Sequence, residues 1–438
     1  MKLEDLVIIS VDDHITEPGT VFDKHLTGDA YASAPKLRTT AKGTNFWEYQ
    51  GKKIPSTGLN AVVGRPKEEY GMEPTALSQL RTGCYDANER VADMNINGMA
   101  ASLNFASFPG FDGGLFVQAP DKAQALTHLR AYNDWHVDEW CGSNPGRFIP
   151  CGLLPTWDMD ATVAELKRLK AKGCNAVSIN ENPTKRDLPS IHNSYWEPLW
   201  KATTDLDIVL CLHIGGGNPA PHASMETPVE AWITTMPMSI AVGAADWLTL
   251  EALNRYPTMK LALSEGGIGW VPYFMERADF SHGQHYAWTH SDYKGKKPSE
   301  VFKRHFLNCF IDDAFGLKNL ESIGEDNVSY ECDYPHSDSL WPHAPERLWE
   351  TVQGLNARQI EKITHANAMR WFNFDLFKHH KREELTVGAL RKLAAAQGVD
   401  TTPKSSGGAA PLAAGETART ITSGDIMRMM QEHGRAAA

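Results

Sequence analysis

The feature that most limits the fold of this chain is an alternation of short apolar runs with segments of helical periodicity. The strand candidates are residues 6–11, 99–105, 148–155, 176–179, 208–213, 260–265, 310–311 and 328–332. The helix candidates between them are residues 86–98, 119–144, 158–172, 195–205 and 247–255. Strands that alternate with helices pair in parallel through right-handed crossovers. The pattern predicts an α/β fold, a (β/α)₈ TIM barrel, and no GxGxxG or Walker sequence supports an open, doubly wound sheet.

Two regions fall outside the alternation. Residues 31–85 are rich in Gly, Pro and Lys and predict an N-terminal insertion or arm with a hairpin over 46–54, inside a barrel domain of residues 1–380. Residues 381–438 predict a C-terminal helical tail, in which a helix, a Pro/Gly/Ala/Ser linker and a Met-rich terminal helix follow one another. The sequence leaves open whether this tail is mobile or docks on a sister subunit.

Composition narrows the class of partner and the compartment. The formal net charge of −11 argues against nucleic acid or an anionic membrane as the main partner. Seven cysteines without CxxC spacing fit a reducing compartment better than a disulfide framework. The first residues are acidic, and no apolar run approaches the length of a membrane span. We therefore expect a cytoplasmic enzyme that acts on a small molecule.

Side chains able to bind a metal follow four of the predicted strands: Asp12 with His14, His213, Glu265 and Asp333. Asp12 and His14 are two residues apart, so they face the same side of an extended segment. A barrel gathers the carboxyl ends of its strands into one ring. Any one of these residues alone is as well explained by a structural hydrogen bond, but together they predict one divalent ion. Nitrogen and oxygen ligands favour Zn²⁺ first and Mn²⁺ second.

Aromatic residues that follow predicted strands are candidates for a substrate pocket. They are Phe108, Phe111, Trp270, Tyr273 and Trp341. Large flat side chains of this kind line many small-molecule pockets. A purely structural aromatic core explains the same residues equally well, and the sequence leaves both readings open.

Several motifs taken together carry a resemblance to a known family. They are Val11-Asp12-Asp13-His14 with Glu17-Pro18, the strand ending at His213, the segment 264–273, Asp333-Tyr334-Pro335-His336 and the segment 364–368. Over residues 6 to 375 the chain resembles the amidohydrolase-related family, which includes the aminocarboxymuconate semialdehyde and resorcylate types of decarboxylase. The resemblance implies a metal-dependent TIM barrel, commonly dimeric, with the ion held by Asp12, His14, His213 and Asp333. The chain departs from the decarboxylases at Glu265, where they usually carry a histidine.

The acidic residues suggest which reaction the centre supports. If Asp12, Asp333 and Glu265 are all ionised beside one dication, the formal charge is about −1, which disfavours a carboxylate substrate. The leading hypothesis is therefore hydrolysis of an amide, ester, thioester or lactone by metal-bound water. Asp333 or Glu265 would act as general base, and His336 or His282 would protonate the leaving group. The alternative is nonoxidative decarboxylation of a hydroxylated aromatic acid, with Asp333 delivering a proton to carbon. A non-catalytic barrel is the third reading.

Overall fold

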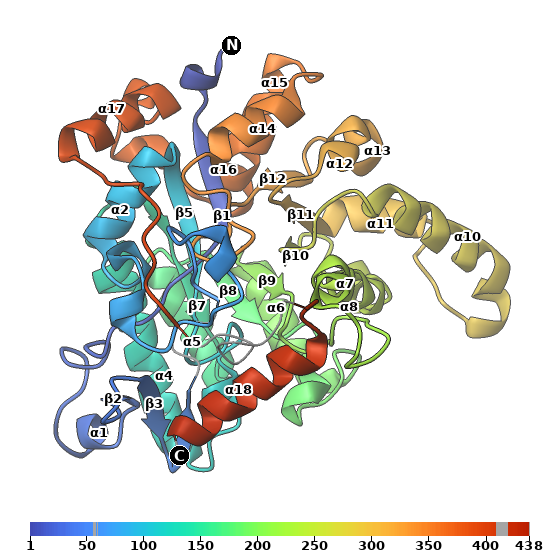
Figure 1. Cartoon of the computed structure of the whole chain (residues 1–438). Coiled ribbons are helices and arrows are strands. Elements are labelled where there is room, and N and C mark those ends of the chain that lie inside the picture. The colour runs from blue at the N-terminus through green and yellow to red at the C-terminus, as the bar shows by residue number, and fades with distance from the viewer. Residues whose placement is uncertain (56–57, 59, 409–418, 438) are drawn as a thin grey trace.

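Parallel strands form the centre of the molecule, with helices around them (Figure 1). The computed structural model describes residues 1–55, 58, 60–408 and 419–437. The barrel strands are β1 (Ile8–His14), β5 (Met99–Phe105), β6 (Phe148–Ile149), β7 (Cys151–Leu153), β8 (Ala176–Ile179), β9 (Val209–His213), β10 (Lys260–Ser264), β11 (Phe306–Phe310) and β12 (Val328–Tyr330). Pro150 lacks a backbone N–H and separates β6 from β7, which together occupy one barrel position. The ladders run β1-β5-β6 and β7-β8-β9-β10-β11-β12.

The barrel closes between its last and first strands. The segment after β12 lies along β1, where the Asp333 N–H donates to the Asp12 carbonyl at 2.7 Å. The His14 N–H donates to the Tyr334 carbonyl, also at 2.7 Å. The predicted TIM barrel is therefore confirmed, and its closure brings residues more than 300 positions apart in the chain to adjacent sites.

The helices follow the strands in the predicted order. They are α2 (Ala87–Ile96), α3 (Gly114–Val117), α4 (Lys122–Asp134), α5 (Met159–Ala171), α6 (Glu197–Asp205), α8 (Met238–Leu248), α9 (Ala252–Arg255), α11 (Pro298–His305), α12 (Ala314–Lys318), α13 (Leu320–Ile323), α14 (Ala344–Val352), α15 (Ala357–Glu361) and α16 (Asn367–Trp371). Asp86 caps α2, because its carboxylate accepts from the N–H groups of Asn88 and Glu89. Helix α4 continues as a π-helix over Trp135–Cys141, which accounts for the length of the predicted segment.

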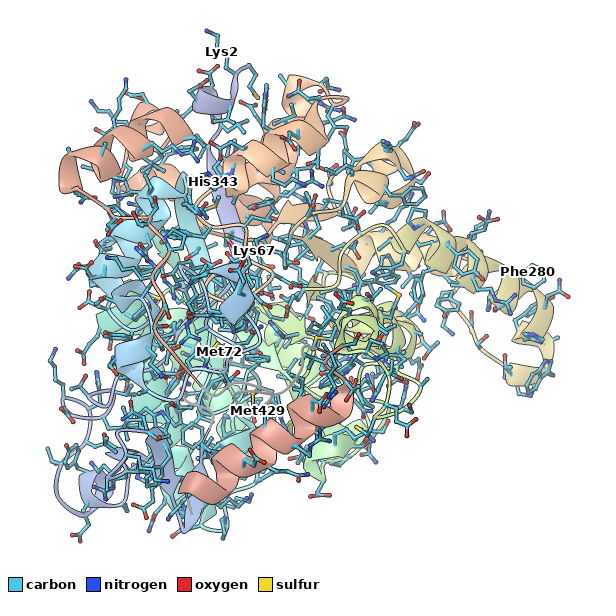
Figure 2. All side chains as sticks on the ribbon, viewed as in Figure 1. Lys2, Lys67, Met72, Phe280, His343 and Met429 are labelled. Carbon is cyan, nitrogen blue, oxygen red and sulfur yellow. The ribbon has the colours of Figure 1, made fainter. Side chains whose placement is uncertain are left out.

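The N-terminal insertion contains a helix and a small antiparallel sheet. Its elements are α1 (Gly28–Ala32), β2 (Lys36–Thr39), β3 (Asn45–Tyr49) and β4 (Lys52–Ile54). The tail contains α17 (Val387–Gln397) and α18 (Ser423–Ala437). Helix α18 crosses from α7 (Val229–Thr235) toward β4, and its Met429 is buried (Figures 1 and 2). The structure thus places the terminal helix on its own chain.

One long helix was absent from the sequence prediction. Helix α10 (Val271–Thr289) forms an arm that projects from the barrel, and Phe280 lies far out on it (Figure 2). The arm exposes Tyr273, Phe280, Tyr286 and Trp288 to solvent. None of the helices in the described residues is both long and apolar enough to span a bilayer.

Candidate metal centre

The first two ligand candidates stand at the end of β1. Asp12 and His14 point the same way, and His14 Nε2 lies 3.3 Å from Asp12 Oδ1. Their side chains are 0% and 1% exposed. Arg90, itself buried, donates to the His14 carbonyl at 2.5 Å and to the Gly83 carbonyl at 2.7 Å. This arginine therefore fixes the backbone that carries the imidazole.

His213, at the end of β9, faces the same point. Its Nε2 is 3.2 Å from His14 Nε2 and 3.3 Å from Asp12 Oδ2. Its Nδ1 lies 2.7 Å from the Ile214 carbonyl, and because a carbonyl only accepts, Nδ1 carries the proton. The Nε2 lone pair is then directed at the group formed by Asp12 and His14, as expected of a metal-binding imidazole.

Asp333 completes the group from the segment after β12. Its φ of +55° is rare for a residue with a side chain, and the hydrogen bond to the Asp12 carbonyl holds it there. Asp333 Oδ1 is 3.2 Å from His14 Nε2 and 2.8 Å from His336 Nδ1. Burial raises the pKa of Asp333, but the charges of His336 and His14 outweigh burial and leave the pKa below its ordinary value.

The donor set fits a divalent cation. All four carboxylate oxygens of Asp12 and Asp333 are buried, and the nearest polar groups to them among the described residues are the imidazoles of His14, His213 and His336. Buried ionised oxygens without partners are costly unless a cation compensates them. The candidate ligands form two groups that share His14: Asp12, His14 and His213 make one, and His14, Asp333 and His336 make the other. Imidazole nitrogens and carboxylate oxygens are ligands that divalent transition ions prefer. The structure thus brings Asp12, His14 and His213 together and places Asp333 beside His14, and the site suits a divalent metal ion.

Glu265 lies beside this group, directly after β10, and also has a positive φ of +60°. Its Oε2 is 3.4 Å from His213 Nε2. Its backbone N–H donates to both carboxylate oxygens of Glu331, at 3.1 Å each. Burial and the charges of Asp333 and Asp12 raise the pKa of Glu265 well above its ordinary value.

Glu331 was missed by the sequence analysis. Its side chain is fully buried, and it holds the strained backbone of Glu265. The sequence held a sign of its role: Glu331 is two residues before Asp333, and side chains two residues apart point to the same side of an extended segment.

Phe111 is the aromatic residue that reaches the centre. Its ring centroid is 4.8 Å from that of His14 and 4.2 Å from that of His213. Phe105 lies 5.0 Å from His213, and the His336 ring lies 4.0 Å from His14. The imidazoles of His14 and His213 are thus surrounded by rings that shield them from water.

The other four predicted pocket residues are not gathered here. Phe108 stacks on Trp47 at 4.0 Å and is 4% exposed, so it belongs to the core. The indole of Trp341 donates to a backbone carbonyl of α2 at 3.0 Å, and that of Trp270 to the carbonyl four residues before it at 2.9 Å. Tyr273 is 72% exposed on α10.

Of the two proton donors proposed from sequence, only His336 lies at the centre. His282 is on α10, where its Nδ1 is 3.1 Å from Ser291 Oγ. It is therefore part of the projecting arm and not of the group around His14.

A family model described as amidohydrolase matches residues 46–374 of the chain. The chain belongs to the amidohydrolase family. This amidohydrolase is 22% identical over 312 residues to 2-amino-3-carboxymuconate-6-semialdehyde decarboxylase of Dictyostelium discoideum, with 69% of this chain and 80% of that protein covered. It is 24% identical over 309 residues to gamma-resorcylate decarboxylase of Rhodococcus jostii, with 64% and 84% covered.

Solved structures show the same fold. An amidohydrolase from Mycobacterium avium subsp. paratuberculosis superposes with a TM-score of 0.65 at 17% identity, covering 84% of this chain and 99% of that one. A 5-carboxyvanillate decarboxylase from Novosphingobium aromaticivorans, solved with bound manganese, has a TM-score of 0.58 at 18% identity, covering 85% and 99%.

These relatives correct the predicted reaction. The curated relatives of this amidohydrolase are named decarboxylases, so the preference for hydrolysis was wrong. The charge argument treated Glu265 as an ordinary carboxylate, whereas burial and the charges of Asp333 and Asp12 raise its pKa.

Proposed function

We propose that this amidohydrolase is a metal-dependent, nonoxidative decarboxylase of a small hydroxylated aromatic acid or a related unsaturated carboxylic acid. The observation that carries the proposal is the Asp333–His336 pair, with Oδ1 and Nδ1 2.8 Å apart, beside the convergent ligands. Such a pair can hold a proton and deliver it within a site that excludes water. The names of the curated relatives support the same reaction class.

The reaction needs one bond broken and one formed. The bond between the ring carbon and the carboxylate breaks, carbon dioxide leaves, and the electron pair left on the ring carbon takes up a proton. A divalent ion held by Asp12, His14, His213 and Asp333 would bind the substrate's carboxylate and neighbouring oxygen and stabilise negative charge there. The protein's own residues must then bring the proton and orient the ring.

Asp333 is the group we assign to proton delivery. Because the pKa of Asp333 lies below its ordinary value, the proton would rest on His336 Nδ1 and would pass through Asp333 to the ring carbon. The His336 ring packs against that of His14, with centroids 4.0 Å apart and ring planes 30° apart, and this contact restricts the movement of the imidazole.

Phe111 is the residue we assign to substrate orientation. It packs on both His14 and His213, and it would offer its ring to the face or edge of an aromatic substrate. Exclusion of water around these residues also favours protonation by the protein over an uncontrolled exchange with solvent.

We propose Mn²⁺ ahead of Zn²⁺ as the ion. The two carboxylates make the donor set harder than a set of histidines alone, and the relative from Novosphingobium aromaticivorans was solved with manganese. We also propose a homodimer in the cytoplasm. The exposed rings of Tyr273, Phe280, Tyr286 and Trp288 on α10 support self-association.

The test is to load the protein with Mn²⁺ or Zn²⁺ and supply hydroxybenzoates in D₂O. We expect release of carbon dioxide with one deuterium in place of the lost carboxylate. Asp333→Asn should abolish both, whereas Lys53→Gln, on the insertion, should change neither. Cleavage of a ring, ester or amide without carbon dioxide would reject the proposal.

A further inference from the structure

A cavity of about 500 Å³ lies at the rim of the barrel, apart from the metal centre. It is bounded by β4, the start of α4 and the loops after β7 and β8. Its principal lining residues are Lys52, Lys122, Arg186, Trp157, Gln118 and Leu188, and we call it the rim pocket. None of the residues assigned to metal binding lines it.

The rim pocket carries a surplus of positive charge in a chain of net charge −11. Arg186 is held by Asp112, whose two carboxylate oxygens accept from it at 2.8 and 3.0 Å. Lys52 and Lys122 have no ion-pair partner in the part of the chain that the structure describes. Asp187 is the acidic residue of the lining, so with Arg186 paired to Asp112 the two lysines leave one positive charge uncompensated.

The ammonium group of Lys122 lies within the field of Lys52. Partial burial and the charge of Lys52 lower the pKa of Lys122. Two ammonium groups held near one another across a cavity lower their repulsion when an anion lies between them. The geometry of the pocket thus favours a negatively charged occupant.

An apolar wall lies next to these charges. The Lys122 ammonium is 5.4 Å from the centroid of the Trp157 ring, and Leu188 and Val117 continue the surface. An indole beside cations suits a flat ring that bears an anionic group, since the ring packs on the indole while the anion meets the ammonium groups. An inorganic anion would contact the ammonium groups but would leave the indole of Trp157 without a packing partner.

We propose that the rim pocket binds a small aromatic carboxylate at a site separate from the metal centre. The proposal does not depend on the reaction proposed above, because it rests on residues that take no part in that reaction. The pocket adjoins the centre through Asp112, which pairs with Arg186 and directly follows Phe111 in the chain.

The experiment titrates 4-fluorobenzoate into the full-length protein and follows ¹⁹F NMR. The background is the Asp12→Asn/His213→Asn variant, in which the metal centre cannot contribute. We expect saturable binding of one equivalent. Lys52→Gln combined with Lys122→Gln should weaken it about 10-fold, as two partly screened charge contacts are lost. Both lysines lie at the surface, so the substitutions leave the core intact.

Matched probes and a matched variant decide the outcome. Lys53→Gln removes the same charge from the neighbouring position, where the ammonium lies 5.3 Å from the Phe46 ring instead of lining the pocket. We expect this control to bind like the parent. Inorganic phosphate and 4-fluorobenzyl alcohol should each compete at least about 10-fold less well than benzoate. Phosphate lacks the aromatic ring, and the alcohol lacks the negative charge.

Three results would overturn the proposal. Binding unchanged in the Lys52→Gln/Lys122→Gln variant would place the ligand elsewhere. An equal loss of affinity for 4-fluorobenzoate in Lys53→Gln would show that the general surface charge attracts the ligand. Equal competition by phosphate, or by the uncharged alcohol, would reject the aromatic carboxylate as the ligand class.

Discussion

Removal of the ion should measurably destabilise the protein. The four carboxylate oxygens of Asp12 and Asp333 are buried in the folded state, which can bind the ion, whereas the unfolded chain does not hold the site together. At a free ion concentration 100 times Kd, binding stabilises the folded state by about 2.7 kcal/mol. For 438 residues the unfolding entropy is about 0.9 kcal/mol per kelvin, so the shift in Tm is about 3 °C.

The assay is thermal unfolding of chelator-treated protein at increasing Mn²⁺. Each further tenfold rise in free ion should add about 1.5 °C. Asp12→Asn/His213→Asn should respond to Mn²⁺ by less than about 1 °C, because it has lost an anionic ligand and an imidazole. His192→Asn, which removes a surface contact to Asp246, should respond like the parent. A full Mn²⁺ shift in the double variant would refute the assigned ligand set.

Three further predictions test single residues. His336→Asn should lower kcat for decarboxylation about 100-fold while metal content by elemental analysis is unchanged; equal loss of metal would make His336 a ligand. Gly316→Ala should lower the urea-unfolding free energy by about 1–3 kcal/mol, since the new Cβ would lie 2.3 Å from Ile268 Cγ1; an unchanged midpoint would contradict this packing. Burial lowers the pKa of His136 to about 4 from 6.5, so the unfolded chain takes up the proton first as pH falls. Stability should therefore drop by about 2 kcal/mol more between pH 7 and pH 5 in the parent than in His136→Gln, and equal losses would argue against a neutral buried imidazole.

The barrel, and the approach of Asp12, His14 and His213 to one another, could be predicted because both depend on local patterns. The apolar run that became β9 ends at His213, and β1 carries Asp12 and His14 two residues apart. Parallel pairing then brings the carboxyl ends of the strands to one edge of the barrel, and this does not depend on where each helix begins or ends. The register confirms this, since Ser264 at the end of β10 pairs with His213.

The environment of individual side chains could not be read in the same way. Phe108 and Trp341 lie in irregular segments after strands, where the direction of a side chain depends on the turn and not on a period. The arm of α10 was missed because its rings, such as Phe280 and Trp288, are exposed and do not form one buried face. The protonation of Glu265 depends on neighbours that only the folded chain brings close.

The closure of the barrel has a consequence for the order of events during synthesis. Asp12 and His14 leave the ribosome among the first residues, whereas Asp333 is made after three quarters of the chain. The hydrogen bonds of Asp333 and Tyr334 with β1 join the two ends of the sheet at the place where the ion would bind. A nascent chain therefore cannot acquire the complete set of ligands early. The metal ion would therefore bind late, to a nearly complete polypeptide in which Asp333 has already paired with β1. Shorter nascent chains would not bind the ion at this site.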